Sequence, residues 1–237
     1  DGIRDSVASR GLGDVYKRQA LSGGMDSTSL LIHLLNEGYL VDCISFNYGQ
    51  KHMIEIERAS ENIIYLKSKG FTVNHEVVDL TSAMSIFHSA LTTDGMSVPE
   101  GHYEEEQMKA TVVPNRNAIF SSIIYGHALS IVSRENTDVK IALGVHSGDH
   151  AIYPDCRPEF YESLEQAFRI GNWDSEKVEF FLPYIDLDKS SILLDALSSC
   201  ERLGLDFDTI FSNTITSYNP DSEGRSSGKT GSDIERI

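Results

Sequence analysis

The hydrophobic and polar positions of the chain follow two periods in alternation, one typical of helices and one typical of strands. Leucines recur at helical spacing over residues 27–37, and Gly38 is placed to end that helix. Residues 39–46 are rich in β-branched and aromatic side chains and predict a strand. The same criteria predict helices over 50–69, 114–134, 158–170 and 189–202, and strands over 71–78, 139–145 and 178–182. We expect the helix over 114–134 to begin at Pro114, because the N–H that proline lacks has no partner there.

This alternation predicts an α/β fold, in which a parallel sheet carries helices on both faces. In such folds ligands bind at the carboxyl ends of the strands. We expect the main domain to span residues 20–205 and a small C-terminal lobe to span 206–237. The chain stops at Ile237 in a segment of helical character, which leaves open that the lobe has been cut short.

Residues 1–19 have no clear period and lack the apolar core of a signal peptide. The segment resembles a translated sequencing-adapter peptide, and the alternative is a natural disordered tail. A strand is expected before Leu21, yet only Val15, Tyr16 and Ala20 supply apolar side chains for it. The first strand is therefore the least supported element of the prediction.

Charge and composition exclude several classes of partner. The chain has 20 basic and 36 acidic residues, a net charge of -16, and such a surface repels the phosphate backbone of nucleic acids. Cys43, Cys156 and Cys200 are odd in number and widely spaced, which predicts a reducing, cytoplasmic setting without disulfides. The most apolar stretch, 118–132, is too short and too polar to span a membrane.

A glycine-rich segment lies where the first strand should give way to the first helix. It consists of Leu21, Ser22, Gly23, Gly24, Met25, Asp26, Ser27 and Thr28. Paired glycines let the backbone approach a ligand closely, and a helix start offers N–H groups to an anion. The hydroxyl groups can donate to phosphate oxygens, and Asp26 can cap the helix or hold Mg²⁺. A turn without a ligand is the simpler alternative, but the position between strand and helix favours a nucleotide site.

This segment resembles the signature of the pyrophosphate-loop ATPases, which cleave ATP between its α- and β-phosphates. The resemblance implies the adenine-nucleotide alpha-hydrolase-like form of the α/β fold. Further motifs follow in order, at 46–52 (FNYGQKH), 113–117 (VPNRN), 153–160 (YPDCRPEF) and 188–189 (DK). Together they resemble the 7-cyano-7-deazaguanine synthases of the queuosine and archaeosine pathway, from Ala20 to Arg236.

The resemblance implies a two-stage ligation of a small deazaguanine substrate with ammonia. ATP adenylates 7-carboxy-7-deazaguanine, and ammonia displaces AMP to give an amide. The amide is adenylated in turn and loses AMP to leave the nitrile. ATP and Mg²⁺ are the implied cofactors, and a homodimer is typical of the family.

The site residues are carried over from the motifs, position by position. Arg116 and Lys189 are the expected cations for the phosphates, and together with Asp26 they are the expected catalytic residues. The expected substrate-binding residues are Tyr48, Gln50, Asn117, Asp149, Tyr153, Asp155 and Arg157. Each has a structural alternative, since tyrosines can belong to the core and cations can be solvated or paired. His146 and His150 beside Asp149 suggest a metal site as another alternative, without a helical pattern to support it.

One part of the family pattern is missing from this sequence. The family ends in a four-cysteine zinc site, whose positions are taken here by Ser217, Ser227, Thr230 and Asp233. Neutral hydroxyls are poor Zn²⁺ ligands, and one carboxylate does not replace four thiolates. We therefore expect no zinc here, although Zn²⁺ is a cofactor of the family. Two other functions stay open, a related ligase acting on a different carboxylate or acceptor, and a non-catalytic nucleotide-binding homologue.

Overall fold

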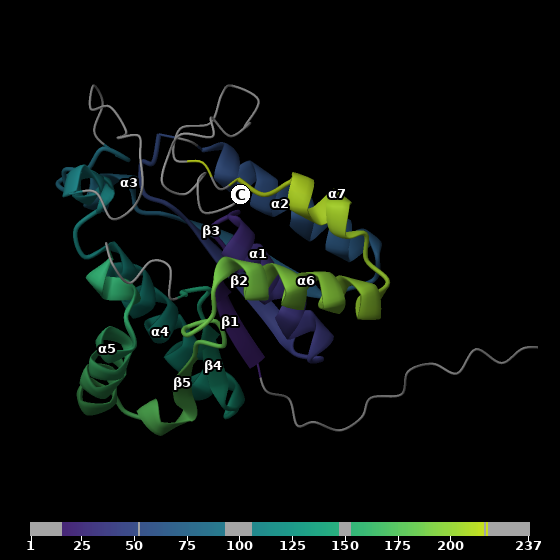
Figure 1. The fold of residues 1–237 in the computed structure, drawn as a ribbon. Helices are drawn as coiled ribbons and strands as arrows, with labels where there is room; N and C mark the ends of the chain where they lie inside the picture. Colours follow the sequence, from purple (N-terminus) through teal and green to yellow (C-terminus); the bar gives the residue numbers. More distant parts are fainter. Residues whose placement is uncertain (1–15, 52, 93–105, 147–152, 216, 218–237) are drawn as a thin grey trace, which may run out of the picture.

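A single parallel sheet organises the protein (Figure 1). The computed structural model describes residues 16–51, 53–92, 106–146, 153–215 and 217. The strands are β1 (Tyr16–Ala20), β2 (Leu40–Asn47), β3 (Val73–Asp79), β4 (Val139–Ala142) and β5 (Val178–Phe181). They pair in parallel in the order β3-β2-β1-β4-β5, which confirms the predicted α/β fold.

Helices cover both faces of this sheet (Figure 1). One face carries α1 (Met25–Asn36), α2 (Ile54–Ser68), α6 (Lys189–Leu203) and α7 (Phe207–Ser212). The other face carries α4 (Arg116–Glu135) and α5 (Pro158–Gly171). Shorter elements are α3 (Thr81–Met84) and 3-10 helices at Glu106–Thr111, Pro154–Cys156 and Ser175–Lys177. Strand β2 contributes to the hydrophobic core on both faces, so six of its eight residues are buried.

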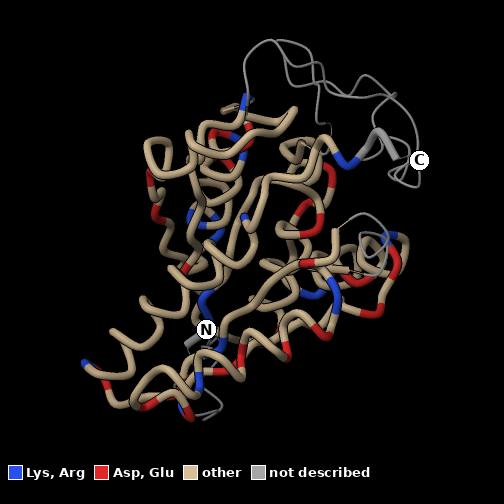
Figure 2. The backbone as a smooth tube through the Cα atoms, turned by 90° about the vertical axis from the view of Figure 1, so that its left-hand side faces the viewer, with Lys and Arg blue, Asp and Glu red and all other residues tan. Residues whose placement is uncertain are grey.

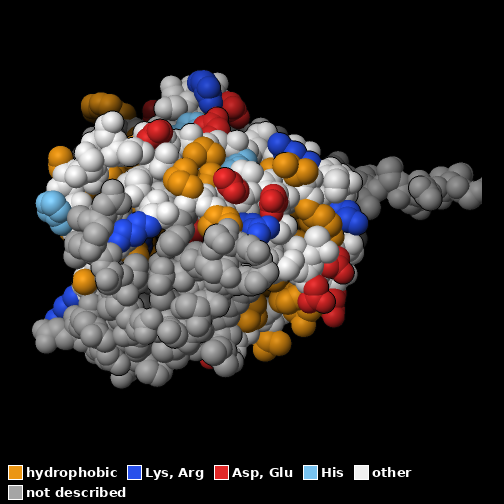
Figure 3. Space-filling model, turned by 90° about the horizontal axis from the view of Figure 1, so that it is seen from above, with side chains coloured by type: hydrophobic (Ala, Val, Ile, Leu, Met, Phe, Trp, Pro, Cys, Tyr) orange, Lys and Arg blue, Asp and Glu red, His pale blue; other side chains and the backbone are white. Residues whose placement is uncertain are grey.

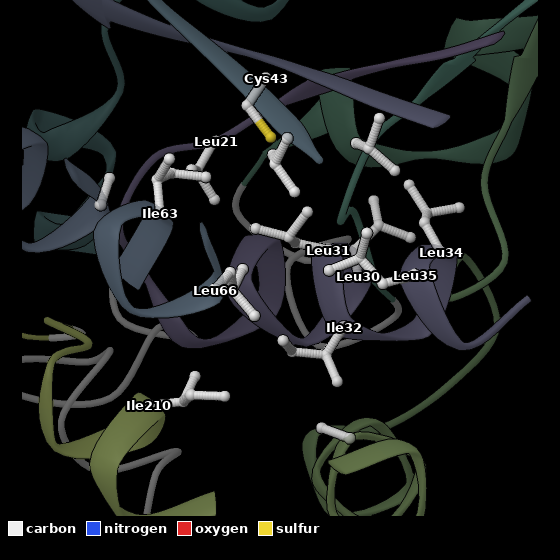
Figure 4. Packing of buried hydrophobic residues seen from close by; sticks show 14 of the residues in the cluster. Leu21, Leu30, Leu31, Ile32, Leu34, Leu35, Cys43, Ile63, Leu66 and Ile210 are labelled. Carbon is white, nitrogen blue, oxygen red and sulfur yellow. The ribbon is translucent and has the colours of Figure 1, made fainter. Parts of the chain in front are cut away.

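Helix α1 is enclosed on several sides. Its fully buried residues include Leu30, Leu31, Ile32 and Leu34. In Figure 4 these side chains leave the helix in more than one direction, with residues of β2, α2 and α7 around them. A helix that is apolar on all sides belongs in a core. The packing of α1 therefore fixes where its N-terminus, the end that follows the glycine-rich segment, points.

Helix α7 continues the main core. Ile210 and Phe211 are buried in the same cluster as α1, and the side chain of Asn62 donates to the carbonyl of Ile210 at 3.1 Å. Residues 206–212, which we assigned to a C-terminal lobe, thus pack against the main body. Residues 218–237 lie outside the described part of the chain.

Several predicted element boundaries are wrong: the helix predicted from residue 50 begins at Ile54, and two further differences lie in α4 and β4. Helix α4 begins at Arg116 and not at Pro114, because Asn115 adopts a left-handed conformation (φ 60°) immediately before it. Strand β4 ends at Ala142, whereas the prediction extends it to residue 145. After Ala142, Gly144 lies against the first residues of α1. The differences in α4 and β4 both lie at the carboxyl edge of the sheet, where ligands bind in folds of this class.

The central strand β1 consists largely of polar residues that we had placed outside the domain. Residues 16–19 precede the expected start at residue 20, whereas residues 1–15 lie outside the described part. Backbone groups form the ladders to β2 and β4 whatever side chains the strand carries, so the sheet is continuous. The buried side chains of Arg18 and Gln19 find partners, Asp42 at 3.1 Å and the carbonyl of Ser27 respectively.

The polar side-chain atoms of β1 are only partly compensated: Arg18 Nε and Gln19 Oε1 lack hydrogen-bond partners among the described residues, and so does Lys17 Nζ. Lys17 Nζ lies over the rings of Tyr39 and Phe181, 3.9 and 3.1 Å from their centroids. Burial, and repulsion from Lys140, lower the pKa of Lys17 to about 8. The strand at the centre of the sheet therefore carries an incompletely compensated charge.

Charged side chains are spread over the described chain. Figure 2 shows acidic and basic positions distributed among many segments. On the face seen in Figure 3, described basic side chains stand among acidic and apolar ones without forming a continuous stripe. Among the described helices, none has the length and apolar character needed to cross a membrane.

Replacing Lys17 by methionine is expected to stabilise the protein at pH 7. Methionine keeps most of the length of the side chain but removes the buried charge, for a gain of about 1–2 kcal/mol. Folding lowers the pKa of Lys17 from 10.5 to about 8, so the stability of the wild type rises between these pH values. The difference between the two proteins in chemical denaturation should therefore shrink over this interval.

Lys67→Met is the matched control, because Lys67 is exposed in the last turn of α2. This substitution should leave the change in unfolding free energy between about pH 8 and pH 10.5 as it is in the wild type. A Lys17→Met protein less stable than the wild type at pH 7 would contradict the prediction and show that the ammonium–aromatic contacts dominate.

Candidate nucleotide site

A cavity of about 280 Å³ lies at the carboxyl ends of the central strands. Its walls include Ala20 and Leu21 at the end of β1, and Leu143 and Gly144 after β4. The chain runs from β1 toward β3 on one side of the sheet, and β4 and β5 lie on the other side. The cavity therefore lies where the strand order reverses, the usual ligand position in open α/β sheets.

The glycine-rich segment forms one wall of this cavity. Gly23 has a φ of 85°, a conformation that side chains disfavour. A Cβ atom on Gly23 would lie 2.1 Å from the carbonyl oxygen of Glu55 in α2. Only glycine thus permits this close approach between the loop and α2.

Two serine hydroxyls form hydrogen bonds within the glycine-rich loop. Ser22 Oγ and Ser27 Oγ lie 3.0 Å apart, and the N–H of Ser22 donates to Ser27 Oγ at 3.2 Å. The N–H of Gly24 donates to Ser22 Oγ at 3.2 Å. Both serines also line the cavity, so their hydroxyls can turn from these contacts toward a ligand.

Helix α1 presents its N-terminus to the cavity through Met25, Asp26 and Ser27. Gly24 occupies the N-cap position and supplies no side-chain cap, so the first-turn N–H groups are suited to an anion. Asp26 Oδ2 lies 3.5 Å from Nε2 of the buried His146. Its Oδ1 is buried without a hydrogen-bond partner among the described residues, an arrangement that fits an incoming cation such as Mg²⁺.

Gly144 brings the end of β4 against this helix start. A Cβ atom there would lie 3.1 Å from the carbonyl carbon and oxygen of Asp26 and 3.2 Å from the N–H of Ser27. Thr28, the last residue of the predicted loop, is buried within α1 and does not line the cavity. The backbone of Gly23 likewise supports the loop without lining the cavity.

The opposite wall is aromatic and carries Arg116. Arg116 opens α4, and its Nη1 donates to the hydroxyl of Tyr48 at 3.5 Å. Burial raises the pKa of Tyr48, although the positive charge of Arg116 opposes this shift. Phe120 lies beside Tyr48 and stacks on Phe46, with centroids 5.5 and 4.1 Å away respectively. The three rings line the cavity together with the guanidinium group.

Lys189 enters the cavity from a third direction. It is the first residue of α6, whose N-cap Asp188 accepts a hydrogen bond from the N–H of Ser191 at 2.7 Å. The capped start of α6 thus places the lysine beside the glycine-rich segment. The structure thereby brings together the three expected catalytic residues, Asp26, Arg116 and Lys189, around one cavity.

The expected substrate-binding residues are only partly brought together. Tyr48, Gln50 and Asn117 line the cavity. Both ends of the Gln50 amide are engaged with backbone, Oε1 with the N–H of Tyr48 and Nε2 with the carbonyl of Phe46. Asn117 Nδ2 donates to the carbonyl of Asp155 at 3.4 Å, which ties the cavity wall to the following motif.

Three residues of that following motif do not line the cavity. The hydroxyl of Tyr153 is buried against Thr111 Oγ1, 2.8 Å away. Asp155 is half-buried and Arg157 is exposed, both outside the cavity wall. Asp149 and His150 lie outside the described residues, as does the rest of that loop over 147–152.

Several cavity residues are missing from our sequence-based candidates, among them Phe120 and Glu55. Phe120 lies in α4, where the helical pattern predicts only a core side chain. Glu55 is the second residue of α2, and burial raises its pKa to about 7. Glu55 follows the FNYGQKH motif by three residues, and this proximity could have marked it as a candidate. Its burial could not be predicted, because it depends on the packing of α2 against the loop.

The donor set of the zinc-ligand positions does not fit zinc. Ser217 is buried and offers only a neutral hydroxyl, whereas Ser227, Thr230 and Asp233 lie outside the described residues. The three cysteines are buried in separate elements and form no disulfide with one another. The described part of the chain holds no group of three or more His, Cys, Asp or Glu side chains placed to bind a metal.

The C-terminal segment nevertheless reaches the site. The N–H of Ile215 donates to the carbonyl of Gly23 at 3.1 Å, and Ile215 lines the cavity. The glycine-rich loop is therefore contacted by α2 through Glu55 and by Ile215.

Comparison with known proteins identifies the family. The sequence profile described as "Queuosine biosynthesis protein QueC" matches residues 19–236. 7-Cyano-7-deazaguanine synthase 1 of Colwellia psychrerythraea is 43% identical over 216 residues, which are 91% of this chain and 89% of that protein. The synthase of Caldicellulosiruptor saccharolyticus is 44% identical over 192 residues, 81% of this chain and 78% of that protein.

Among solved structures, the NMN synthetase from Francisella tularensis covers 92% of this chain and 71% of its own, with a TM-score of 0.42 and 15% identity. This likeness is too low to support an argument about the site. The profile match and the identities to the curated relatives, in contrast, span most of the chain. They show that the chain belongs to the queuosine biosynthesis protein QueC family.

Proposed function

We propose that this protein converts 7-carboxy-7-deazaguanine and ammonia to 7-cyano-7-deazaguanine, with ATP as co-substrate and AMP and pyrophosphate as products. The observation that supports it most strongly is the convergence of the 21–27 loop, Arg116 and Lys189 on one cavity. The relatives described above carry the name of this activity. An arrangement of anion donors beside fixed cations suits the transfer of AMP rather than simple nucleotide storage.

The start of α1 is the phosphate end of the proposed site. Its first-turn N–H groups and the positive end of the helix dipole attract the β- and γ-phosphates. Ser22 and Ser27 add hydroxyl donors from the cavity wall. Asp26 would hold Mg²⁺, which supplies positive charge to the triphosphate when bound. Arg116 and Lys189 neutralise the charge that develops on the departing pyrophosphate.

The aromatic wall is the proposed position of the deazaguanine ring. Phe46, Tyr48 and Phe120 present flat apolar faces to the cavity, which suit the faces of a fused heterocycle. Asn117 lines the cavity as well, and its side-chain amide, which also donates to the backbone of Asp155, can hydrogen-bond to a ring edge. The carboxylate of the substrate would then point toward the phosphate end, where it attacks the α-phosphorus.

Product analysis tests the proposed reaction directly. Incubation with ATP, Mg²⁺, ammonia and 7-carboxy-7-deazaguanine should yield the nitrile, with AMP and pyrophosphate, by mass spectrometry. AMP without nitrile would overturn the assigned product in favour of another acceptor. A folded protein that forms no AMP would overturn the enzymatic proposal as a whole.

Gly23→Ala should abolish pyrophosphate release while the protein still folds. The added Cβ would meet the carbonyl oxygen of Glu55, so the loop has to move away from α2. Gly38→Ala is the control, because Gly38 has a similar positive φ of 79° and no heavy atom within 4 Å of the new Cβ. Both variants bear about 1–2 kcal/mol of backbone strain, but only Gly23→Ala alters the site.

A steady-state assay of pyrophosphate release compares the two glycine variants, with thermal unfolding as the measure of strain. Equal loss of activity in both would contradict a specific role for the contact between Gly23 and Glu55.

The purified protein should contain no stoichiometric zinc, by elemental analysis, yet keep its activity in a strong chelator supplemented with excess Mg²⁺. Neutral hydroxyls at the ligand positions explain this expectation. The variant with Ser217→Cys, Ser227→Cys, Thr230→Cys and Asp233→Cys restores four thiols and should bind zinc and unfold at a higher temperature. One zinc per chain in the unmodified protein would contradict the prediction.

A further inference from the structure

Glu55 is a carboxylic acid in the cavity to which the proposed function assigns no task. It lies in the first turn of α2, where an exposed carboxylate would interact favourably with the helix N-terminus. Here the side chain lines the cavity, while the carbonyl oxygen of the same residue lies against Gly23 of the loop. The backbone contact thus fixes the carboxyl group beside the site of ATP binding.

The surroundings of Glu55 make its proton exchangeable near neutral pH. Burial raises its pKa to about 7, and the charge of Arg116 acts in the opposite direction. Glu55 in turn helps to raise the pKa of Tyr48. The remaining titratable or charged groups that line the cavity are Asp26, Lys51, Cys156, Tyr161 and Lys189. Among the carboxylates of the cavity, Asp26 is paired with His146 and lies at the phosphate end.

The proposed reaction requires a proton acceptor at nitrogen. Ammonia is present near neutral pH mainly as ammonium, which has no lone pair with which to attack. The amide nitrogen must later lose both of its protons when the nitrile forms. Arginine and lysine cations cannot accept these protons, whereas a carboxylate with a pKa near the working pH can.

We propose that Glu55 is the base that accepts protons from the nitrogen of the ammonia substrate, an inference that rests on the function proposed above. In the first stage, ammonium gives a proton to Glu55. Its lone pair then forms the C–N bond as the C–O bond to AMP breaks. The second proton that the new amide must shed leaves with solvent or AMP.

In the second stage, the amide oxygen bonds to the α-phosphorus of ATP as pyrophosphate leaves. Glu55 accepts a proton from the nitrogen. The nitrogen electron pair then completes the C≡N triple bond as AMP departs with the oxygen, and the last proton is released. Atoms and charge balance without any oxidant or reductant.

Glu55→Gln separates this role from binding, because glutamine keeps the size and polarity of the side chain but not its basicity. Adenylation is measured alone, as exchange of labelled pyrophosphate into ATP that depends on 7-carboxy-7-deazaguanine. We expect exchange close to the wild-type rate. Amide formation from ammonia at pH 7 should fall by roughly 100-fold, as is typical for loss of a general base.

Hydroxylamine provides the decisive comparison, because it is already neutral at pH 7 and needs no prior deprotonation. Hydroxamate formation by Glu55→Gln should therefore stay close to wild type. The wild-type rate with ammonia should rise as Glu55 ionises near pH 7. The variant should instead follow the deprotonation of ammonium at higher pH, and Glu55→Asp, which keeps a carboxylate, should recover part of the lost rate.

Glu57→Gln is the matched control, since Glu57 is exposed on the same turn of α2. It should leave all three rates unchanged. If Glu55→Gln lowered exchange, amide formation and hydroxamate formation equally, the residue would only support the loop and the proposal would be overturned. An unchanged rate with ammonia would overturn it too. Absence of exchange in the wild type would instead refute the proposed function itself.

Discussion

The rest of the site depends on two close backbone approaches at glycines. Gly23 lies against the carbonyl oxygen of Glu55 in α2, and Gly144 lies against the backbone of Asp26 at the start of α1. Between them the first turn of α1 is held from both sides, by a helix and by the end of a central strand. A Cβ at residue 23 would force the loop away from α2, and one at residue 144 would press on the start of α1, so the phosphate end of the cavity would be distorted.

This placement is rigid because α1 is packed on several sides. Its buried leucines and isoleucine join β2, α2, α6 and α7 in one core. The helix therefore has no freedom to tilt when a negatively charged ligand approaches its N-terminus. Dipoles that are already oriented need no reorganisation during reaction, which is the most effective form of electrostatic catalysis. The packing of the hydrophobic core thus determines the orientation of the N–H groups that act in the site.

The parts of the site that could be predicted are those whose chemistry is local in sequence. The 21–28 loop and Arg116 are recognisable from neighbouring residues, and the alternation of periods predicts the parallel fold. Glu55 acquires its environment only when α2 meets the loop, and Tyr153 turns out to bond to Thr111 because of how distant segments pack. Strand β1 could not be predicted with assurance either, since its backbone pairs regardless of its polar side chains.

The absence of a cysteine at position 217 affects the glycine-rich loop, because the neighbouring Ile215 is hydrogen-bonded to Gly23 of this loop. A zinc–thiolate bond would tether this segment strongly, but the serine at position 217 cannot supply a thiolate. The segment makes contacts of another kind, among them the hydrogen bond from the N–H of Ile215 to the carbonyl of Gly23 and the one from Thr214 Oγ1 to the Phe211 carbonyl. These side chains are also buried. Such contacts open more readily than a metal site does. Ile215 also lines the cavity. A ligand that fills the cavity adds contacts to Ile215 and stabilises its position. In this chain, occupancy of the site therefore helps to hold Ile215 against the glycine-rich loop.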